Sequence, residues 1–138
     1  MKKLVITLPK ILAMVFLSCS SSKEDADIRL HDIWALESIK EEKIILDETI
    51  KNLPVLEIYV AEERFHGNTG CNTMDGKVNI DGDKISFERI IKSEMACPGN
   101  LEQNFITNLN KVNKYKIEKM RLYLFDEEKE LLVFKKID

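Results

Sequence analysis

Most of the chain beyond residue 30 alternates apolar and polar residues with a period of two, and one segment does not. The clearest alternating stretch, KVNIDGDKISF at 77–87, has an Asp-Gly turn between two such runs, which is typical of a β-hairpin. In residues 101–112, apolar side chains instead recur every three or four positions, the period of an amphipathic helix. Several strands and one helix indicate the α+β class, in which the helix covers one face or end of a sheet.

The alternation predicts about seven or eight strands joined by links that are mostly short enough for antiparallel pairing. It slips at Ile90-Ile91, which indicates a bulge or a strand end. Asn100 and Gln103 fit a capping box at the start of a helix near 100–113. We therefore expect a small curved antiparallel sheet, or partial barrel, with one covering helix. The alternating segments are 32–39, 43–47, 54–63, 64–67, 77–87, 115–126 and 130–136.

The first 18 residues have the form of a secretory leader, because two lysines precede an apolar run that ends at a small residue. Pro9 and Lys10 interrupt this run, which is too short for a good membrane span. The tetrapeptide FLSC at 16–19 resembles the lipobox of bacterial lipoproteins, in which the leader is removed and the cysteine receives lipid. We expect lipidation of Cys19 and membrane attachment through that lipid. The alternative is an ordinary cleaved signal that leaves Cys19 free.

Residues 19–30 are predicted to be the lipidated cysteine and a flexible tether, since three serines and a charged tract without periodicity follow Cys19. Within this tract, SKED at 22–25 resembles the tag that exports some lipoproteins to the cell surface. The predicted location is the bacterial outer membrane, on either its periplasmic face or the cell surface. The remaining residues, 31–138, are predicted to form one domain.

Charge excludes one class of partner. The leader contains Lys2, Lys3 and Lys10 and no acidic residue, so its removal changes the net charge from −3 to −6. Nucleic-acid binding depends on neutralising phosphates with clustered lysine and arginine, and this chain has no such cluster. We therefore expect no nucleic-acid partner.

The three cysteines restrict the possible cross-links. If Cys19 carries lipid, Cys71 and Cys97 remain as one pair, and an exported protein meets an oxidising compartment in which such a pair tends to join. No C-x-x-C spacing occurs, so a structural zinc site is not predicted. The sequence leaves open whether the 71–97 bond forms.

The stretch HGNTGCNTMDG at 66–76 is dense in glycine and asparagine. Gly67 and Gly70 fit positions where the backbone needs positive φ or close approach, and Asn72 suits a tight loop in which its side chain bonds nearby backbone. We interpret the stretch as a structural corner pinned by Cys71. The alternative is a binding surface shared with SEMACPG at 93–99, because loops on a rigid sheet often carry binding residues.

A set of motifs spread over His31–Phe134 resembles the META domain, also called HslJ-like. The Gly-Cys-Asn and Met-Ala-Cys motifs, in this order and at this distance, make the resemblance specific, although Val78 stands where the family often has an aromatic residue. The motifs are WALESI at 34–39, GNTGCN at 67–72 with Gly76 following, SEMAC at 93–97 with Met95, Glu102 and Phe105 in the helix, and LYLF and LLVF near the end.

The resemblance implies a small antiparallel sheet or barrel with one helix, found in many exported bacterial proteins. It implies links to stress response and envelope integrity, and no defined activity. We expect a non-catalytic binding or scaffold module whose partner is an envelope protein. The alternative is a barrel-like carrier or inhibitor that holds a small apolar ligand at its mouth.

Catalytic and metal sites have weak support. His66 and Cys71 could form a Cys-His pair, but a disulfide at Cys71 would remove its thiolate. DGKVNIDGD at 75–83 has the composition of a calcium loop, yet lysines fall where a ligand or a glycine is required. The glycine-rich stretch has no phosphate-loop pattern. We expect no enzyme activity, no cofactor and no metal.

Overall fold

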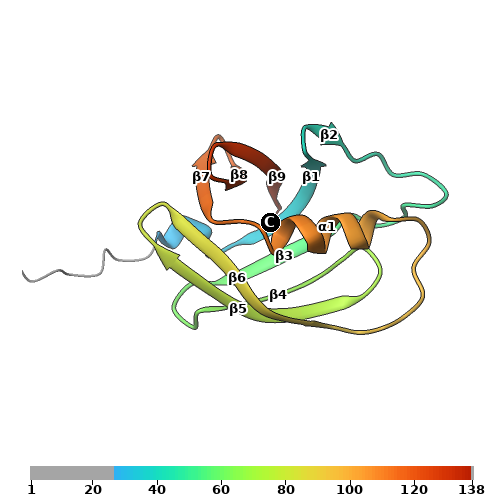
Figure 1. Ribbon diagram of the computed structural model, residues 1–138, viewed down its shortest axis with the longest axis horizontal. Helices are drawn as coiled ribbons and strands as arrows, with labels where there is room; N and C mark the ends of the chain where they lie inside the picture. Colours follow the sequence, from blue (N-terminus) through green and yellow to red (C-terminus); the bar gives the residue numbers. More distant parts are fainter. Residues whose placement is uncertain (1–26, 138) are drawn as a thin grey trace, which may run out of the picture.

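The computed structural model of the protein describes residues 27–137, so the predicted leader and Cys19 lie outside the described residues. The described part contains one sheet and one α-helix (Figure 1), which confirms the α+β prediction. No helix in this part is long and apolar enough to cross a membrane. The elements are η1 (Ile28–Leu30), β1 (Ile33–Ile39), β2 (Glu42–Lys43), β3 (Val55–Tyr59), β4 (Arg64–Asn68), β5 (Thr73–Asp81), β6 (Lys84–Lys92), α1 (Leu101–Leu109), β7 (Lys114–Glu118), β8 (Arg121–Asp126) and β9 (Lys129–Ile137).

The sheet curves into a partial barrel. Its strand order is β2-β1-β3-β4-β5-β6-β7-β8-β9, every pairing is antiparallel, and β1 also pairs with β9, which brings the first and last strands together. The seam between β6 and β7 contains a single register pair, Lys84 with Lys114, so the two strands diverge beyond it. The curved, incompletely closed sheet predicted from the alternation is thus confirmed.

Helix α1 follows β6 in the chain and lies against β9 and β1 (Figure 1). Phe105 and Leu109 on its inner face are fully buried, and the Phe105 ring meets Phe134 of β9 edge to face with centroids 6.1 Å apart. Burial of two such side chains stabilises the fold by several kcal/mol, at about 2 kcal/mol each. The helix therefore completes the core.

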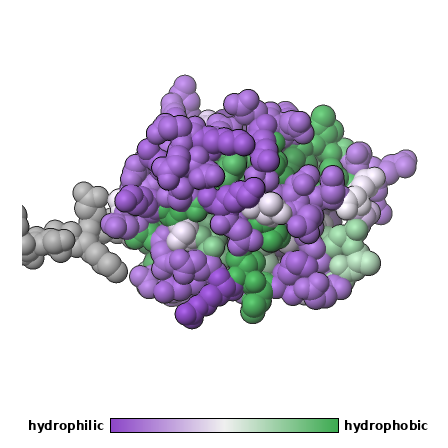
Figure 2. Space-filling view, in the orientation of Figure 1, coloured by the Kyte–Doolittle hydropathy of each residue, from purple (hydrophilic) through white to green (hydrophobic). Residues whose placement is uncertain are grey.

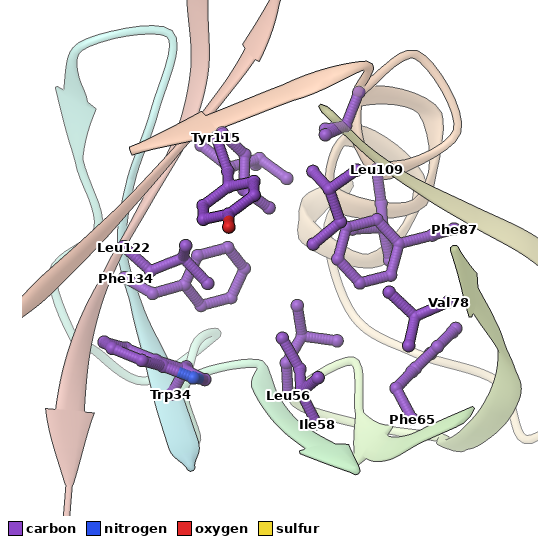
Figure 3. Packing of buried hydrophobic residues seen from close by; sticks show 14 of the residues in the cluster. Trp34, Leu56, Ile58, Phe65, Val78, Phe87, Leu109, Tyr115, Leu122 and Phe134 are labelled. Carbon is purple, nitrogen blue, oxygen red and sulfur yellow. The ribbon is translucent and has the colours of Figure 1, made fainter. Parts of the chain in front are cut away.

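The interior of the sheet is filled by its own side chains (Figure 3). Phe65 and Phe87 meet edge to face at 5.3 Å on one side, and Trp34 lies on the other, where its indole N–H donates to the Leu30 carbonyl. An interior filled in this way argues against the alternative of a barrel-like carrier that holds an apolar ligand at its mouth. Labelled members of the cluster are Trp34, Leu56, Ile58, Phe65, Val78, Phe87, Leu109, Tyr115, Leu122 and Phe134.

The bulge expected at Ile90-Ile91 is present one residue earlier. Asp75 pairs with Ile91 and Lys77 with Glu88, so Arg89 and Ile90 oppose one residue of β5. Arg89 has φ of 52°. The extra residue shifts the face that each following side chain occupies, and Ile91 is exposed.

Two local predictions were wrong. The predicted strand 43–47 is reduced to the two residues of β2, and Ile45 and Leu46 are exposed, because this segment leaves the sheet instead of pairing with it. The predicted capping box does not form: the Asn100 side chain makes no cap bond, and Gln103 bonds Thr107 one turn later.

The ends of the helix and of the domain also differ from the expected limits. The helix ends at Leu109, and a turn then places Val112 in the core without helical geometry. At the other end, η1 precedes residue 31 and Leu30 is fully buried. The core therefore includes a residue that the sequence analysis assigned to the tether.

The β3–β4 contact supplies a test of the fold. A Cβ at Gly67 would lie 2.0 Å from the Val55 carbonyl oxygen, which backbone pairing prevents from moving. We expect Gly67→Ala to lower the free energy of unfolding by about 3 kcal/mol or more, as measured by urea denaturation. Gly99→Ala is the comparison: its φ is 69° and its Cβ would meet only a Thr49 methyl group, so about 1–2 kcal/mol is expected. Equal losses would contradict this reading of Gly67.

Candidate functional site

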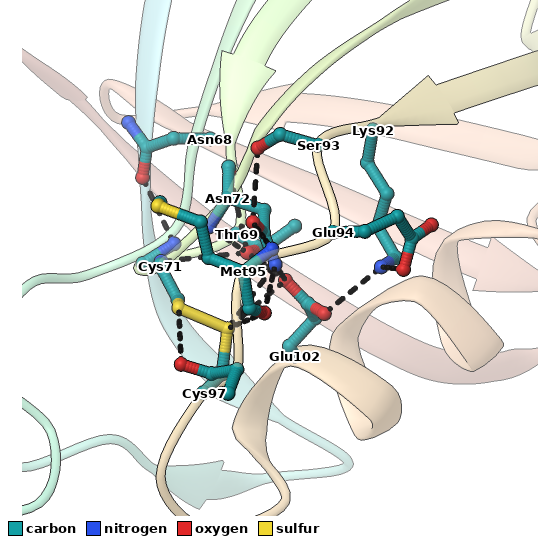
Figure 4. The surroundings of a disulfide bond; sticks show 12 residues. Asn68, Thr69, Cys71, Asn72, Lys92, Ser93, Glu94, Met95, Cys97 and Glu102 are labelled. Carbon is teal, nitrogen blue, oxygen red and sulfur yellow. Dashed lines mark hydrogen bonds and ion pairs between the residues drawn. A yellow bond between two sulfur atoms is a disulfide. The ribbon is translucent and has the colours of Figure 1, made fainter.

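A disulfide between Cys71 and Cys97 joins the β4–β5 loop to the segment that leads into α1 (Figure 4). The two Cα atoms are 6.0 Å apart, and the cysteines are separated by 26 positions. Chain-entropy arguments give a cross-link of this span about 3 kcal/mol of stabilisation. The bond that the sequence left open is present, and it defines a corner of the molecule formed by residues 68–73, 92–97 and Glu102, here called the disulfide corner.

The β4–β5 loop is shaped by its own side chains. The Thr69 hydroxyl accepts the amide N–H of Asn72 at 2.9 Å, and the Asn68 side-chain oxygen accepts the amide of Gly70 at 2.9 Å. Gly70 has φ of 86°, and a Cβ there would lie 2.6 Å from the Asn52 carbonyl oxygen. Glycine is required at this position both for conformation and for space.

Asn72 connects the two loops of the disulfide corner (Figure 4). Its side chain is fully buried, and its oxygen accepts from the Met95 amide at 2.8 Å and the Ser93 hydroxyl at 2.9 Å. Its amide nitrogen donates to the Met95 carbonyl at 3.2 Å and to Glu102 at 2.8 Å. A buried amide with all its bonds satisfied holds the two loops together in addition to the disulfide.

Glu102 brings a negative charge from the first turn of α1 into the disulfide corner. One carboxylate oxygen accepts from the Thr69 hydroxyl at 2.5 Å and from Asn72, and the other lies 3.2 Å from the Lys92 ammonium group. Burial raises the pKa of Glu102, but the bonds from Thr69, Asn72 and Lys92 outweigh burial and hold it below the ordinary 4.5. Bonds from Glu102 and Glu94 raise the pKa of Lys92. Both groups are therefore charged at neutral pH.

The predicted site residues fall into two places. Gly70, Cys71, Asn72, Cys97 and Met95 meet at the disulfide corner, where the Met95 side chain is 61% exposed. Gly67 lies beside it within the β3–β4 pairing. Gly76 lies apart, opposite Phe65 on β4, where the ring covers the space that a side chain would need.

The imagined Cys-His pair is not assembled. Cys71 is oxidised, and His66 instead places Nδ1 2.9 Å from a carboxylate oxygen of Asp75 across the β4–β5 pairing, on the exposed surface. Among residues 27–137, no group of three or more His, Cys, Asp and Glu side chains is arranged to hold a metal ion.

Four residues of the disulfide corner were missed as site residues: Thr69, Lys92, Ser93 and Glu102. Glu102 was noted only within the family motif. A weak signal was available for Glu102. It is acidic and lies in the first turn of the helix that follows Cys97, so it is well placed to meet the loop to which Cys97 is bonded. Thr69 and Ser93 carry no such signal, because their roles depend on the meeting of distant loops.

Comparison with known families decides the relationship. The family model described as META domain matches residues 27–138.

The chain belongs to the META domain family.

The solved structures that resemble this META domain are low in sequence identity and agree in fold. A protein from Burkholderia xenovorans, solved by NMR, is 16% identical with a TM-score of 0.62, and the match covers 94% of this chain and 99% of that one. A DUF4847 family protein from Bacteroides vulgatus, solved by crystallography, is 17% identical with a TM-score of 0.57, covering 80% of this chain and 97% of that one. No match to a curated protein reaches significance.

In the disulfide corner of this META domain, the polar side chains bond to one another. The Asn72 amide and one oxygen of Glu102 are bonded to neighbouring loops, and the other oxygen binds Lys92. Such a network rigidifies the loop that carries Met95. The sulfur atoms of Cys71 and Cys97 are bonded to each other in the disulfide. The corner is suited to holding a surface in one shape.

Acid provides a test of the network. Because the pKa of Glu102 is lower in the folded state, its contribution to stability is full above the ordinary value of 4.5 and is lost as pH falls through the folded value. We expect Glu102→Gln to lower stability at pH 7 and to reduce the slope of stability against pH between about 3 and 5, measured by urea denaturation at each pH. Glu94→Gln is the matched control, since Glu94 also binds Lys92 but is 83% exposed. An unchanged slope in Glu102→Gln would refute the assignment.

Proposed function

We propose that the protein is a lipid-anchored envelope protein whose META domain is a non-catalytic binding or scaffold module, with a role in envelope stress or integrity. The observation that carries this proposal is the disulfide corner, whose polar side chains bond two loops into one rigid surface. A site for chemistry needs a nucleophile or base free to react, whereas here the two cysteine sulfurs are bonded to each other and the half-buried Glu102 carboxylate bonds Asn72 and Lys92.

The surface presented beside the corner supports a protein partner in the envelope. Met95 is exposed at the top of a fixed loop, and Met is common at surfaces that bind other proteins because its side chain adapts to different shapes. The loop itself gains rigidity from Asn72 and the disulfide, which reduces the entropy lost on binding.

A site-specific photo-crosslinker tests the binding role in cells. With the crosslinker in place of Met95, we expect one or a few reproducible adducts of defined mass that require light and an intact envelope. The control position is Glu128, whose side chain is 96% exposed in the β8–β9 turn. The same adducts at both positions, or none at position 95, would contradict a specific partner at the disulfide corner.

Anchoring is tested separately at Cys19. We expect Cys19→Ala to move the protein from the detergent-rich phase to the aqueous phase in a detergent phase-separation experiment, and to abolish incorporation of radiolabelled palmitate. A lipid anchor carries enough apolar chain for stable partitioning when more than one acyl chain is attached. Wild-type protein without label and without detergent partitioning would show that the leader is an ordinary cleaved signal.

A further inference from the structure

An open hollow of about 530 Å³ lies on the outer face of the sheet, between the loop that follows β2 and strands β1, β3 and β9. Its volume is within the range of small-molecule sites. Figure 2 shows hydrophobic side chains at the surface close to β2, where this loop begins and where the molecule is otherwise mostly hydrophilic. The apolar lining is aliphatic, and it consists of Ala35, Leu46, Leu53, Val55 and Ile137.

The floor of this hollow offers apolar contact without main-chain hydrogen bonds. Ala35 of β1 is paired with β3 on one side and with β9 on the other, and Val55 of β3 is paired with β1 and with β4. A peptide lying on these strands would therefore gain no strand pairing from them, and its own N–H and C=O groups would lose water without replacement. A hydrocarbon chain has no such groups, so the floor favours an aliphatic chain.

The two ends of the hollow differ in chemistry. The strand order is β4-β3-β1-β9, so Asn68 of β4 lies at one end of the lining and Ile137 of β9 at the other. Lys51 belongs to the first end, because a Cβ at Gly70 would lie 2.6 Å from the carbonyl oxygen of Asn52, the next residue. A ligand with one polar and one apolar end therefore fits with its polar end at the β4–β5 loop.

The polar end of the hollow presents donors and a positive charge. Among residues 27–137, Lys51 forms no ion pair within 4.0 Å. Asn68 uses its Oδ1 atom to accept the Gly70 N–H at 2.9 Å, which leaves its amide nitrogen to donate to a ligand (Figure 4). None of the described residues that line the hollow is Asp or Glu. This end therefore favours a carboxylate.

We propose that this hollow binds a fatty acid. Its aliphatic chain lies along Ala35 and Val55 toward Ile137. Its carboxylate contacts Lys51 and Asn68. The site is on the outside of the sheet, so it does not require space in the interior, which side chains fill.

This inference goes beyond the proposed function, because it depends on neither the lipid anchor nor a partner at the disulfide corner. An anionic head on one aliphatic chain also occurs in a lysophospholipid. The experiment therefore includes both kinds of ligand.

The test uses the full chain in zwitterionic lipid nanodiscs and two photoreactive probes with the same chain, a diazirine-bearing dodecanoic acid and the matching dodecylamine. Adducts are mapped by mass spectrometry. We expect the acid to label peptides that contain Ala35, Val55 and Ile137 about fivefold more than the amine does, the effect of one exposed charge pair. This labelling is expected to saturate and to be displaced by dodecanoate. Displacement by lysophosphatidylglycerol but not by dodecanoate would overturn the fatty acid as ligand.

Charge reversal at the polar end separates recognition from folding. Lys51→Glu is expected to reverse the preference, so that the amine labels more than the acid, whereas unfolding would remove labelling by both. Asn68→Asp keeps the oxygen that accepts the Gly70 N–H and replaces the donor by an anionic oxygen, so labelling by the acid is expected to fall about fivefold. Lys111→Glu is the matched control, since Lys111 is exposed and does not line the hollow, and it is expected to label as wild type.

Three results would overturn the proposal: equal labelling of the wild type by both probes, adducts spread over the whole surface, or a preference for the acid that Lys51→Glu leaves unchanged. None of them bears on the palmitate and crosslinking experiments. Failure of the fatty-acid site is therefore distinguishable from failure of the proposed function.

Discussion

The pairing of β1 with β9 is the constraint on which the rest of the structure depends. Every other pairing except β1–β3, which skips the short β2, joins strands that are consecutive in the chain, whereas this pairing joins Ile33–Ile39 to Lys129–Ile137. This pairing curves the row of hairpins into a partial barrel, and Trp34 and Phe134 are buried in its interior. Without it, the hairpins would present one apolar face to water, which is a weak arrangement for a sheet.

The seam between β6 and β7 has the opposite character, because the two strands share a single register pair and the chain between them contains the helix. The chain leaves β6, crosses the disulfide corner and returns through α1 before β7 begins. Glu102 lies on that single helix and is bound to the loop of Asn72. The helix therefore supports the disulfide corner at its first turn and the hydrophobic core along its inner face.

Local pattern was enough to predict the hairpin at 77–87, the helix stripe that includes Phe105 and Leu109, and the family. It failed where several local outcomes compete or where a strand needs a partner that the fold does not supply. Gln103 matches a capping box but bonds Thr107 within the helix, and the apolar Ile45 extends a strand pattern that finds no partner. The network of Asn72 and Glu102 could not be derived, because it depends on three segments that meet only in the folded chain.

The pairing of β9 with β1 has a consequence for how the domain folds. The two strands lie far apart in the sequence, and the partial barrel stays open until they pair, so the folding chain presents the edge of β1 and the apolar faces of the hairpins until this non-local contact forms. Shielding by a chaperone is useful throughout that interval. Loss of residues 129–137 would have a disproportionate effect, because it leaves β1 with an unpaired edge, a substrate for quality-control proteases.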